Sequence, residues 1–194
     1  MIGVSIKTVV IFTTDAFSLI NFRGNLIKEL VKKRHVVHTV APNFNPKNQK
    51  ILEELGVITH DCYFERTGTN IISDLKASVH LYYLLKSLNP DCMLSYSIKP
   101  VIYGTICGFF AGVNHRVAMI EGLGSLFSSH FYEITFRHWL RRFLVSKMYK
   151  FSLYFSKENI FLNQDDIDEF DNRGILNKSR ASLLGGIGVD LKNG

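Results

Sequence analysis

Short apolar segments alternate with amphipathic segments along almost the whole chain. The apolar segments predict strands at residues 8–12, 36–40, 57–62, 92–95, 116–120, 160–162 and 181–184. Segments with helical spacing lie between them, at residues 24–33, 46–55, 72–88, 100–111, 131–155 and 164–172. Several strands are apolar at successive positions, as expected where helices cover both faces of a parallel sheet. The order predicts an α/β protein with a Rossmann-like, doubly wound parallel sheet.

The length and composition favour a single domain. The 194 residues are 46% hydrophobic and 21% charged, which is ordinary for one globular unit. A glycine-rich segment, Gly185-Gly186-Ile187-Gly188, follows the last predicted strand. We therefore expect a folded domain at residues 1–184 and the start of a hinge at residues 185–194.

The sequence contains no pattern typical of a signal peptide, a membrane span or a metal site. The N-terminal apolar segment has no basic leader and no small-residue cleavage site, so a strand is expected there rather than a signal peptide. The uncharged residues 100–114 are too few to span a bilayer. The three cysteines, Cys62, Cys92 and Cys107, are widely spaced and are expected to be reduced thiols. The histidines lack ligand spacing, and we predict no metal site.

The chain is basic, with a formal net charge of +6. Nucleic acid, acidic lipid and phosphorylated substrates all fit this charge. No nucleic-acid-binding motif is present, and the basic residues gather on one predicted helix beside aromatic residues, so we expect no nucleic-acid partner.

That helix, at residues 131–155, is amphipathic in an unusual way. Its basic arc consists of Arg137, His138, Arg141 and Arg142. Its apolar arc consists of Tyr132, Phe136, Trp139, Leu140, Phe143 and Leu144, with Lys147 and Lys150 at the margin. The pattern suits attachment to an anionic membrane surface. It also suits a helix that packs its aromatic arc on the core and leaves the basic arc in solvent.

Segments that follow strands are where doubly wound sheets bind ligands. The turn after the first strand lacks the spaced glycines of a dinucleotide site and the lysine of a P-loop. Arg23 and Gly24 open the helix beyond it, where free backbone N–H groups could hold a phosphate. Alternatively, Gly24 only allows the helix to pack closely on the sheet.

Three further segments carry polar candidates. Lys99 precedes Pro100 at a helix start and either meets an anionic ligand or is a solvated lysine. Glu121 precedes Gly122 and Gly124, which allow main-chain amides to approach a ligand. Glu121 could act as a base or accept a sugar hydroxyl, or it could be an exposed carboxylate in a tight turn. His130, near the start of the long helix, is a candidate phosphate donor or proton shuttle, or a surface residue.

The ordered set of motifs resembles the family-4 glycosyltransferases of bacterial surface-polysaccharide synthesis, including capsule and lipopolysaccharide. The similarity lies in the residues at 22–30, 97–104, 116–124, 161–166 and 188–190. The resemblance implies a GT-B architecture, in which two Rossmann-like domains face each other across a cleft. This chain corresponds to the N-terminal half, and a missing or separate C-terminal domain would bind the donor.

The resemblance also implies a reaction. Family members transfer a hexose or N-acetylhexosamine from a nucleotide sugar, with retention of configuration and with neither metal nor cofactor. The acceptor is a polyprenyl-diphosphate-linked sugar at the inner face of the plasma membrane. We therefore expect a cytoplasmic protein that is peripheral on that membrane. The alternative function is that of a non-catalytic module that binds polyprenyl phosphate or the membrane surface.

Carried over by motif position, the resemblance assigns roles to individual residues. Those near the phosphates or acceptor are Arg23, Gly24 and Lys99, and those lining the cleft beside the transferred sugar are Glu121, Gly122 and Gly124. The catalytic candidates are Glu121 and His130. The expected membrane-surface residues are Arg137, Trp139, Arg141, Arg142 and Lys147.

Overall fold

A seven-stranded, fully parallel sheet forms the centre of the protein. The computed structural model describes residues 5–65, 70–122 and 136–186. The strand order is β3-β2-β1-β4-β5-β6-β7, so the order reverses between β1 and β4, as in a doubly wound sheet. The strands are β1 (Thr8–Phe12), β2 (Val36–Ala41), β3 (Ile58–Asp61), β4 (Cys92–Tyr96), β5 (His115–Ile120), β6 (Glu158–Phe161) and β7 (Ala181–Leu183). The predicted fold class is confirmed.

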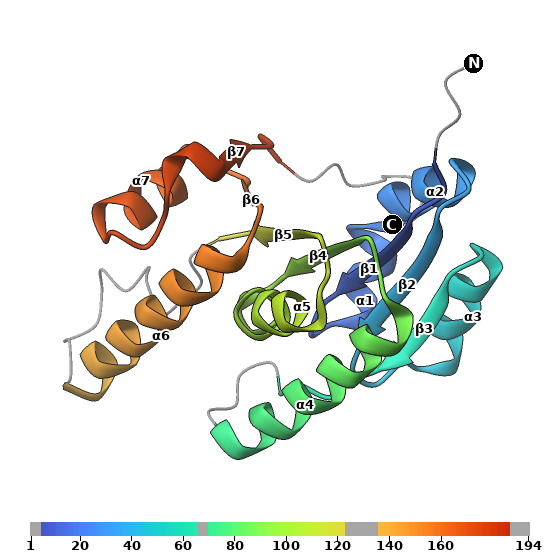
Figure 1. The fold of residues 1–194 in the computed structure, drawn as a ribbon, viewed down its shortest axis with the longest axis horizontal. Coiled ribbons are helices and arrows are strands. Elements are labelled where there is room, and N and C mark those ends of the chain that lie inside the picture. The colour runs from blue at the N-terminus through green and yellow to red at the C-terminus, as the bar shows by residue number, and fades with distance from the viewer. Residues whose placement is uncertain (1–4, 66–69, 123–135, 187–194) are drawn as a thin grey trace.

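Helices cover the two faces of this sheet in separate layers (Figure 1). One layer contains α1 (Ala16–Asn21), α2 (Gly24–Lys32) and α3 (Pro46–Glu54). The other layer contains α4 (Ile71–Leu88), the π-helical turn η1 (Pro100–Gly104), α5 (Thr105–Ala111), α6 (Phe136–Phe155) and α7 (Gln164–Asn172). A short 3₁₀ turn, η2 (Lys178–Arg180), precedes β7. Within the described residues, no helix is both long enough and apolar enough to span a bilayer.

The central strands are buried on both faces, which explains their uninterrupted apolar sequence. In β1, Val9 and Ile11 pack toward α1–α3, whereas Val10 and Phe12 pack toward α4 and α5. A third cluster lies under η1, α6 and α7, around Phe161. Successive side chains of a strand point to opposite faces, so alternate residues of β1 belong to different halves of the core.

Two helical details depart from the pattern in the sequence. α1 was not predicted, because it is only six residues long; it begins where the Asp15 carboxylate accepts a hydrogen bond from the Phe17 N–H, 3.1 Å away. The helix predicted over residues 100–111 is divided into η1 and α5. A Cβ at Gly104 would lie 2.7 Å from Phe12 Cδ1, so only glycine lets η1 approach the sheet this closely.

Helix α2 ends without the glycine that commonly terminates a helix. No glycine stands between Lys32 and β2. Arg34 adopts the left-handed conformation instead, with φ of 65°, and its N–H donates to the Val31 carbonyl. A non-glycine residue in this region is strained, so the short connection to β2 is made at a local conformational cost.

Candidate functional site

The carboxyl ends of β1, β4 and β5 lie side by side at the switch point of the sheet. Thr13 and Thr14 follow β1, Ser97 follows β4, and Glu121 follows β5. The helices run back against the strands, so the first turns of α2 and α4 lie at this same edge. The sheet therefore gathers at one edge five of the seven residues predicted as catalytic or acceptor-binding, namely Arg23, Gly24, Lys99, Glu121 and Gly122.

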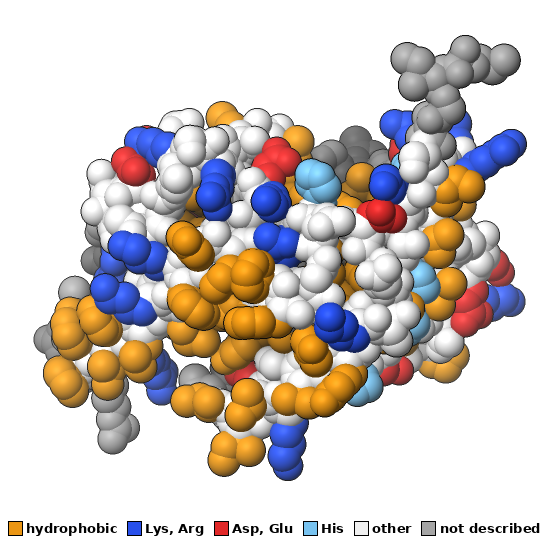
Figure 2. All heavy atoms as spheres, viewed as in Figure 1, with side chains coloured by type: hydrophobic (Ala, Val, Ile, Leu, Met, Phe, Trp, Pro, Cys, Tyr) orange, Lys and Arg blue, Asp and Glu red, His pale blue; other side chains and the backbone are white. Residues whose placement is uncertain are grey.

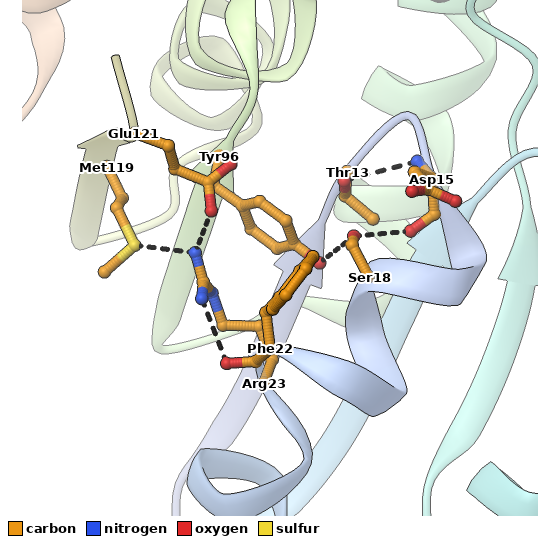
Figure 3. A network of polar contacts seen from close by, with 8 residues as sticks. All are labelled: Thr13, Asp15, Ser18, Phe22, Arg23, Tyr96, Met119 and Glu121. Carbon is orange, nitrogen blue, oxygen red and sulfur yellow. Dashed lines mark hydrogen bonds and ion pairs between the residues drawn. The ribbon is translucent and has the colours of Figure 1, made fainter. Parts of the chain in front are cut away.

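Arg23 lies under this edge as a buried cation (Figure 3). Its side chain is only 2% exposed. The guanidinium lies 4.4 Å from the centroid of the Tyr96 ring, and Nη2 donates to the Glu121 carboxylate. Nη2 also lies 3.0 Å from Met119 Sδ, and Nη1 donates to the Phe22 carbonyl at 3.0 Å. The charge of Arg23 is thus balanced within the protein by Glu121.

Glu121 connects this buried cation to the surface. Its side chain is 26% exposed, so one side of the carboxylate faces Arg23 while the residue reaches the rim of the site. Burial raises the pKa of Glu121, and the neighbouring Arg23 opposes that rise. A carboxyl group with a raised pKa, placed next to a cation at a rim, can accept a hydroxyl hydrogen bond or exchange a proton.

Tyr96 supports the arrangement from below. Its hydroxyl lies 2.8 Å from Ser18 Oγ, and Ser18 Oγ donates to the Asp15 carbonyl at 2.6 Å (Figure 3). Burial raises the pKa of Tyr96 to about 12, so the phenol stays protonated and neutral. These contacts fix the start of α1 to the end of β4. Nothing in the sequence pattern predicted that Tyr96 would connect these elements.

Lys99 forms the second ion pair of this edge. Its Nζ lies 2.7 Å from Asp74 Oδ1 of α4, and the two side chains are only 13% and 5% exposed. Lys99 is therefore not the solvated lysine of the alternative interpretation. The pKa of Tyr103 is raised to about 12, mainly by burial and secondly by the charge of Asp74. An ammonium has three N–H donors, so Lys99 can contact a second anion while it stays bonded to Asp74.

Backbone strain marks the end of β4. Ser97 has a φ of 74°, in the left-handed region that non-glycine residues rarely adopt. Its carbonyl accepts from the Val101 N–H at 3.0 Å, which starts η1. Such strain persists where the surrounding structure enforces it, and it is concentrated at functional sites. The sequence did not predict Ser97 as a site residue, since a serine in a loop carries no signal of its backbone angle.

The other residues predicted to be catalytic or to bind the acceptor are Gly24, Gly122, Gly124 and His130. Gly24 is the first residue of α2, and a Cβ there would meet no atom within 4 Å, so close packing does not explain this glycine. Gly122 follows Glu121 at the rim and is half-buried. Gly124 and His130 lie outside the described residues.

The described part of the aromatic arc of α6 faces solvent, and Tyr132 lies outside the described residues. Phe136, Trp139, Leu140, Phe143 and Leu144 are all exposed, whereas the core contacts of α6 come from residues nearer its end, around Tyr149 and Leu153. These five residues therefore do not pack on the core, contrary to the second interpretation of the helix.

The rings and cations of α6 also interact with each other. Trp139 stacks on Phe143 at a centroid distance of 5.6 Å, and Lys147 Nζ lies 5.2 Å from the Phe143 centroid. Arg141 is exposed and Arg142 is half-buried. A groove of about 420 Å³ lies between α6 and the segment that follows α7, and it is lined by Trp139, Arg142, Phe143, Ser146, Lys147, Lys150, Arg173 and Ile175. The side chain of Arg137 lies outside the described residues.

Other reactive groups have structural surroundings. In the described part of the chain, no three His, Cys, Asp or Glu residues are grouped so that they could hold a metal ion. Burial raises the pKa of the Cys62 thiol to about 12 and that of Cys107 to about 11, so both are unreactive thiols. His38 Nδ1 and His60 Nε2 lie 2.9 Å apart on β2 and β3, with stacked rings. We call these two residues the imidazole pair.

Most of the sequence is similar to that of a sugar transferase. No protein-family model matches it. Over 175 residues it is 29% identical to the N,N'-diacetylbacillosaminyl-diphospho-undecaprenol alpha-1,3-N-acetylgalactosaminyltransferase of Campylobacter jejuni, and the match covers 90% of this chain and 45% of that enzyme. The chain is a distant homologue of a family-4 glycosyltransferase. It spans about half the length of this relative.

Solved structures show the same half-length match. Anabaena HepE, in complex with UDP and glucose, matches with a TM-score of 0.62 and 12% identity over 96% of this chain and 46% of that one. A UDP-N-acetylglucosamine 2-epimerase from Listeria monocytogenes matches with a TM-score of 0.60 and 12% identity over 91% of this chain and 44% of that one. At this identity the likeness establishes the fold alone, which is that of one Rossmann-like half of a GT-B protein.

Proposed function

We propose that this chain is the N-terminal, acceptor-binding domain of a retaining glycosyltransferase. The enzyme would transfer a hexose or N-acetylhexosamine from a nucleotide sugar to a lipid-linked saccharide. The homology to the Campylobacter jejuni enzyme, across 90% of this chain, carries the proposal. That enzyme transfers N-acetylgalactosamine to a sugar on undecaprenyl diphosphate, so a polyprenyl-diphosphate-linked sugar is the proposed acceptor here.

Glu121 is the proposed polar contact for the reacting sugar. It combines a partly exposed carboxylate with a pKa that burial raises. Arg23 would act as a positioning residue, because its buried guanidinium holds the Glu121 carboxylate in place. Lys99, bonded to Asp74, would present its remaining donors to the acceptor phosphates. Gly24, Gly122, Gly124 and His130 are proposed to line the same cleft, on the strength of motif position.

A second domain is proposed to supply the nucleotide sugar, and no other cofactor is needed. In the GT-B arrangement two Rossmann-like halves enclose the reacting groups, and charge that develops in the transition state is stabilised by groups from both. The site described above contributes one wall of such a cleft.

The proposed location is the inner face of the plasma membrane, with the domain peripheral on it. The residues proposed to contact the membrane surface are Arg137, Trp139, Arg141, Arg142 and Lys147. The exposed aromatic residues of α6 support this, since a large apolar surface beside cations is typical of helices that lie in an anionic lipid interface.

Sugar transfer tests the proposal. Radiolabelled nucleotide sugars, UDP-N-acetylgalactosamine among them, would be offered with a polyprenyl-diphosphate-linked saccharide. The chain would be assayed alone and with a bacterial lysate that could supply a donor domain, beside an intact family member as a positive control. For a truncated or split enzyme that is inactive alone, we expect transfer only when the lysate supplies a donor domain. Glu121→Gln should lower that transfer by at least about tenfold. Glu53→Gln, on the remote helix α3, is the matched control and should leave transfer unchanged.

The outcomes separate two functions. Transfer that Glu121→Gln leaves at full rate would contradict the role of Glu121. If no transfer occurred under any condition while the intact family member was active, the second candidate would be favoured. That candidate is a non-catalytic module that binds polyprenyl phosphates or the membrane surface. The exposed aromatic arc of α6 is the observation that supports this candidate.

A further inference from the structure

The solvent side of α4 carries an apolar stripe. Ile72, Leu75, Val79 and Tyr83 follow each other on successive turns and are 70%, 63%, 50% and 67% exposed. The side chains that α4 buries against the sheet are different ones: Asp74, Ala77, Leu81 and Leu85. The stripe therefore contributes nothing to the core that the structure shows, and such a surface usually marks an interaction site.

The stripe belongs to a larger apolar surface. Figure 2 shows hydrophobic side chains along α4, over the middle of the same face, and at the start of α6. In the middle, α5 and α6 share a cluster of rings. Phe109 lies 4.4 Å from Phe155, and Phe151 lies 5.1 Å from Phe155, between ring centroids. Phe110 and Tyr154 extend this cluster and are exposed. We call the solvent side of α4, α5 and α6 the helical face.

The charges on the helical face are almost all of one sign. Across α4, η1, α5 and α6 the sequence contains a single carboxylate, Asp74, which is buried against Lys99. The exposed cations of these helices include Lys76, Lys86, Arg141, Lys147 and Lys150. Carboxylates are placed elsewhere, for example on α3 and α7. A surface that is apolar, basic and free of exposed carboxylates is matched to an anionic lipid layer.

The helical face is also continuous with the candidate site. In this sheet the helices run opposite to the strands, so α4 and α6 begin at the edge where the strands end. The exposed Ile72 is one turn or less from Asp74, and Asp74 bonds to Lys99 at the site. The apolar starts of α4 and α6 therefore flank the edge at which an acceptor sugar would lie.

We propose that α4 is a second membrane-contact element, so that the domain rests on an anionic lipid surface with its whole helical face. This inference rests on the surface attachment in the proposed function and adds an orientation to it. A second copy of the chain fits less well than lipid, because a two-fold contact would bring two cationic faces together. In the proposed orientation the candidate site opens beside the lipid headgroups, within reach of a diphosphate anchored in the membrane.

The chain's only tryptophan makes the orientation measurable. Trp139 is exposed on α6, so its emission reports contact of α6 with lipid. A reporter for α4 is Tyr83→Trp in a Trp139→Phe background. The matched control is Phe17→Trp in the same background, because Phe17 is similarly exposed on α1 in the opposite layer. Each protein is titrated with phosphatidylcholine vesicles with and without phosphatidylglycerol, and quenching by brominated phosphatidylcholine reports insertion.

If the helical face lies on lipid, anionic vesicles should shift the tryptophan emission at positions 83 and 139 to shorter wavelength, and brominated lipid should quench it. Neither change is expected at position 17. A response at 139 but not at 83 would overturn the role of α4 and leave the attachment through α6 intact. A response at position 17 would overturn the orientation. No response anywhere, with no flotation, would overturn both the inference and the surface attachment.

Flotation of charge variants tests the same contact without a reporter. Leu75→Glu with Val79→Glu places two carboxylates in the stripe and should weaken binding to anionic vesicles at least about tenfold. Phe17→Glu with Leu26→Glu makes the same change in charge on the opposite layer and should leave binding within about twofold. Equal binding of both double variants would contradict the inference, provided that circular dichroism shows both to be folded.

Discussion

Replacing Gly104 with alanine tests how closely η1 approaches the sheet. A Cβ at this position would lie 2.7 Å from Phe12 Cδ1 and 2.8 Å from Ser95 Oγ, whereas ordinary contact begins at 3.4 Å. Phe12 is completely buried and cannot swing away. The substitution must therefore displace η1, which leads from Lys99 of the candidate site into α5.

The size of the effect follows from two opposing terms. Forcing a methyl group into a well-packed core costs about 1–3 kcal/mol. Alanine is preferred over glycine in a helix by up to about 1 kcal/mol. We expect Gly104→Ala to lower the free energy of unfolding by about 1–2 kcal/mol, which for a chain of this size corresponds to about 2–8 °C in Tm.

Two other glycines turn this into an ordered series. At Gly108 a Cβ would lie 3.3 Å from Met93 Sδ, a flexible side chain that can yield, so the effect should be intermediate. At Gly24 nothing lies within 4 Å of a Cβ, so alanine should be neutral or slightly stabilising. Urea denaturation followed by far-ultraviolet circular dichroism measures all three. If Gly104→Ala were as stable as Gly24→Ala, the reasoning about η1 would be refuted.

Three more predictions concern charged groups. Asp74→Asn should destabilise the protein by about 3 kcal/mol, measured with urea, because it leaves Lys99 largely buried without its counter-charge; an unchanged midpoint would contradict this. Arg23→Met should raise the pKa of Glu121 further, since Arg23 opposes the rise caused by burial, and carbon NMR of the carboxyl group measures it. Burial lowers the pKa of both histidines in the imidazole pair below 6.5, so the unfolded chain takes up these protons more readily than the folded one. The free energy of unfolding should therefore fall as the pH drops below about 6.5, and the fall should be smaller in His60→Gln.

The sequence predicts the sheet well because burial on both faces leaves a strong local pattern. β1, β4 and β5 are apolar at successive positions, and each was predicted within a residue or two of its observed bounds. The start of α7 was equally readable: Asn163 caps it by accepting from the Asp166 N–H at 2.8 Å. These features depend only on neighbouring residues.

The site was predictable in its location but not in its contacts. Arg23 and Glu121 were each noticed, yet nothing in the chain indicated that they would bond across 98 positions. The pairing of Lys99 with Asp74 likewise depends on how α4 packs beside β4. Tyr96 resembles any apolar strand residue until its ring is seen beneath a guanidinium. Long-range pairing is a property of the assembled sheet, so a single sequence does not reveal it.

If this domain holds the acceptor, it must bind the lipid-linked sugar in preference to the nucleotide sugar, and nuclear magnetic resonance can distinguish the two. The ¹⁵N-labelled chain would be titrated with a short-chain polyprenyl-diphosphate-linked N-acetylhexosamine and, separately, with UDP-N-acetylgalactosamine. If the domain holds the acceptor, the lipid-linked sugar will shift the amide signals of Thr14, Ser97, Glu121 and Gly122, and the nucleotide sugar will leave them in place. If the nucleotide sugar shifted these signals and the lipid-linked sugar did not, the chain would be a donor-binding half, which would contradict the proposed acceptor role.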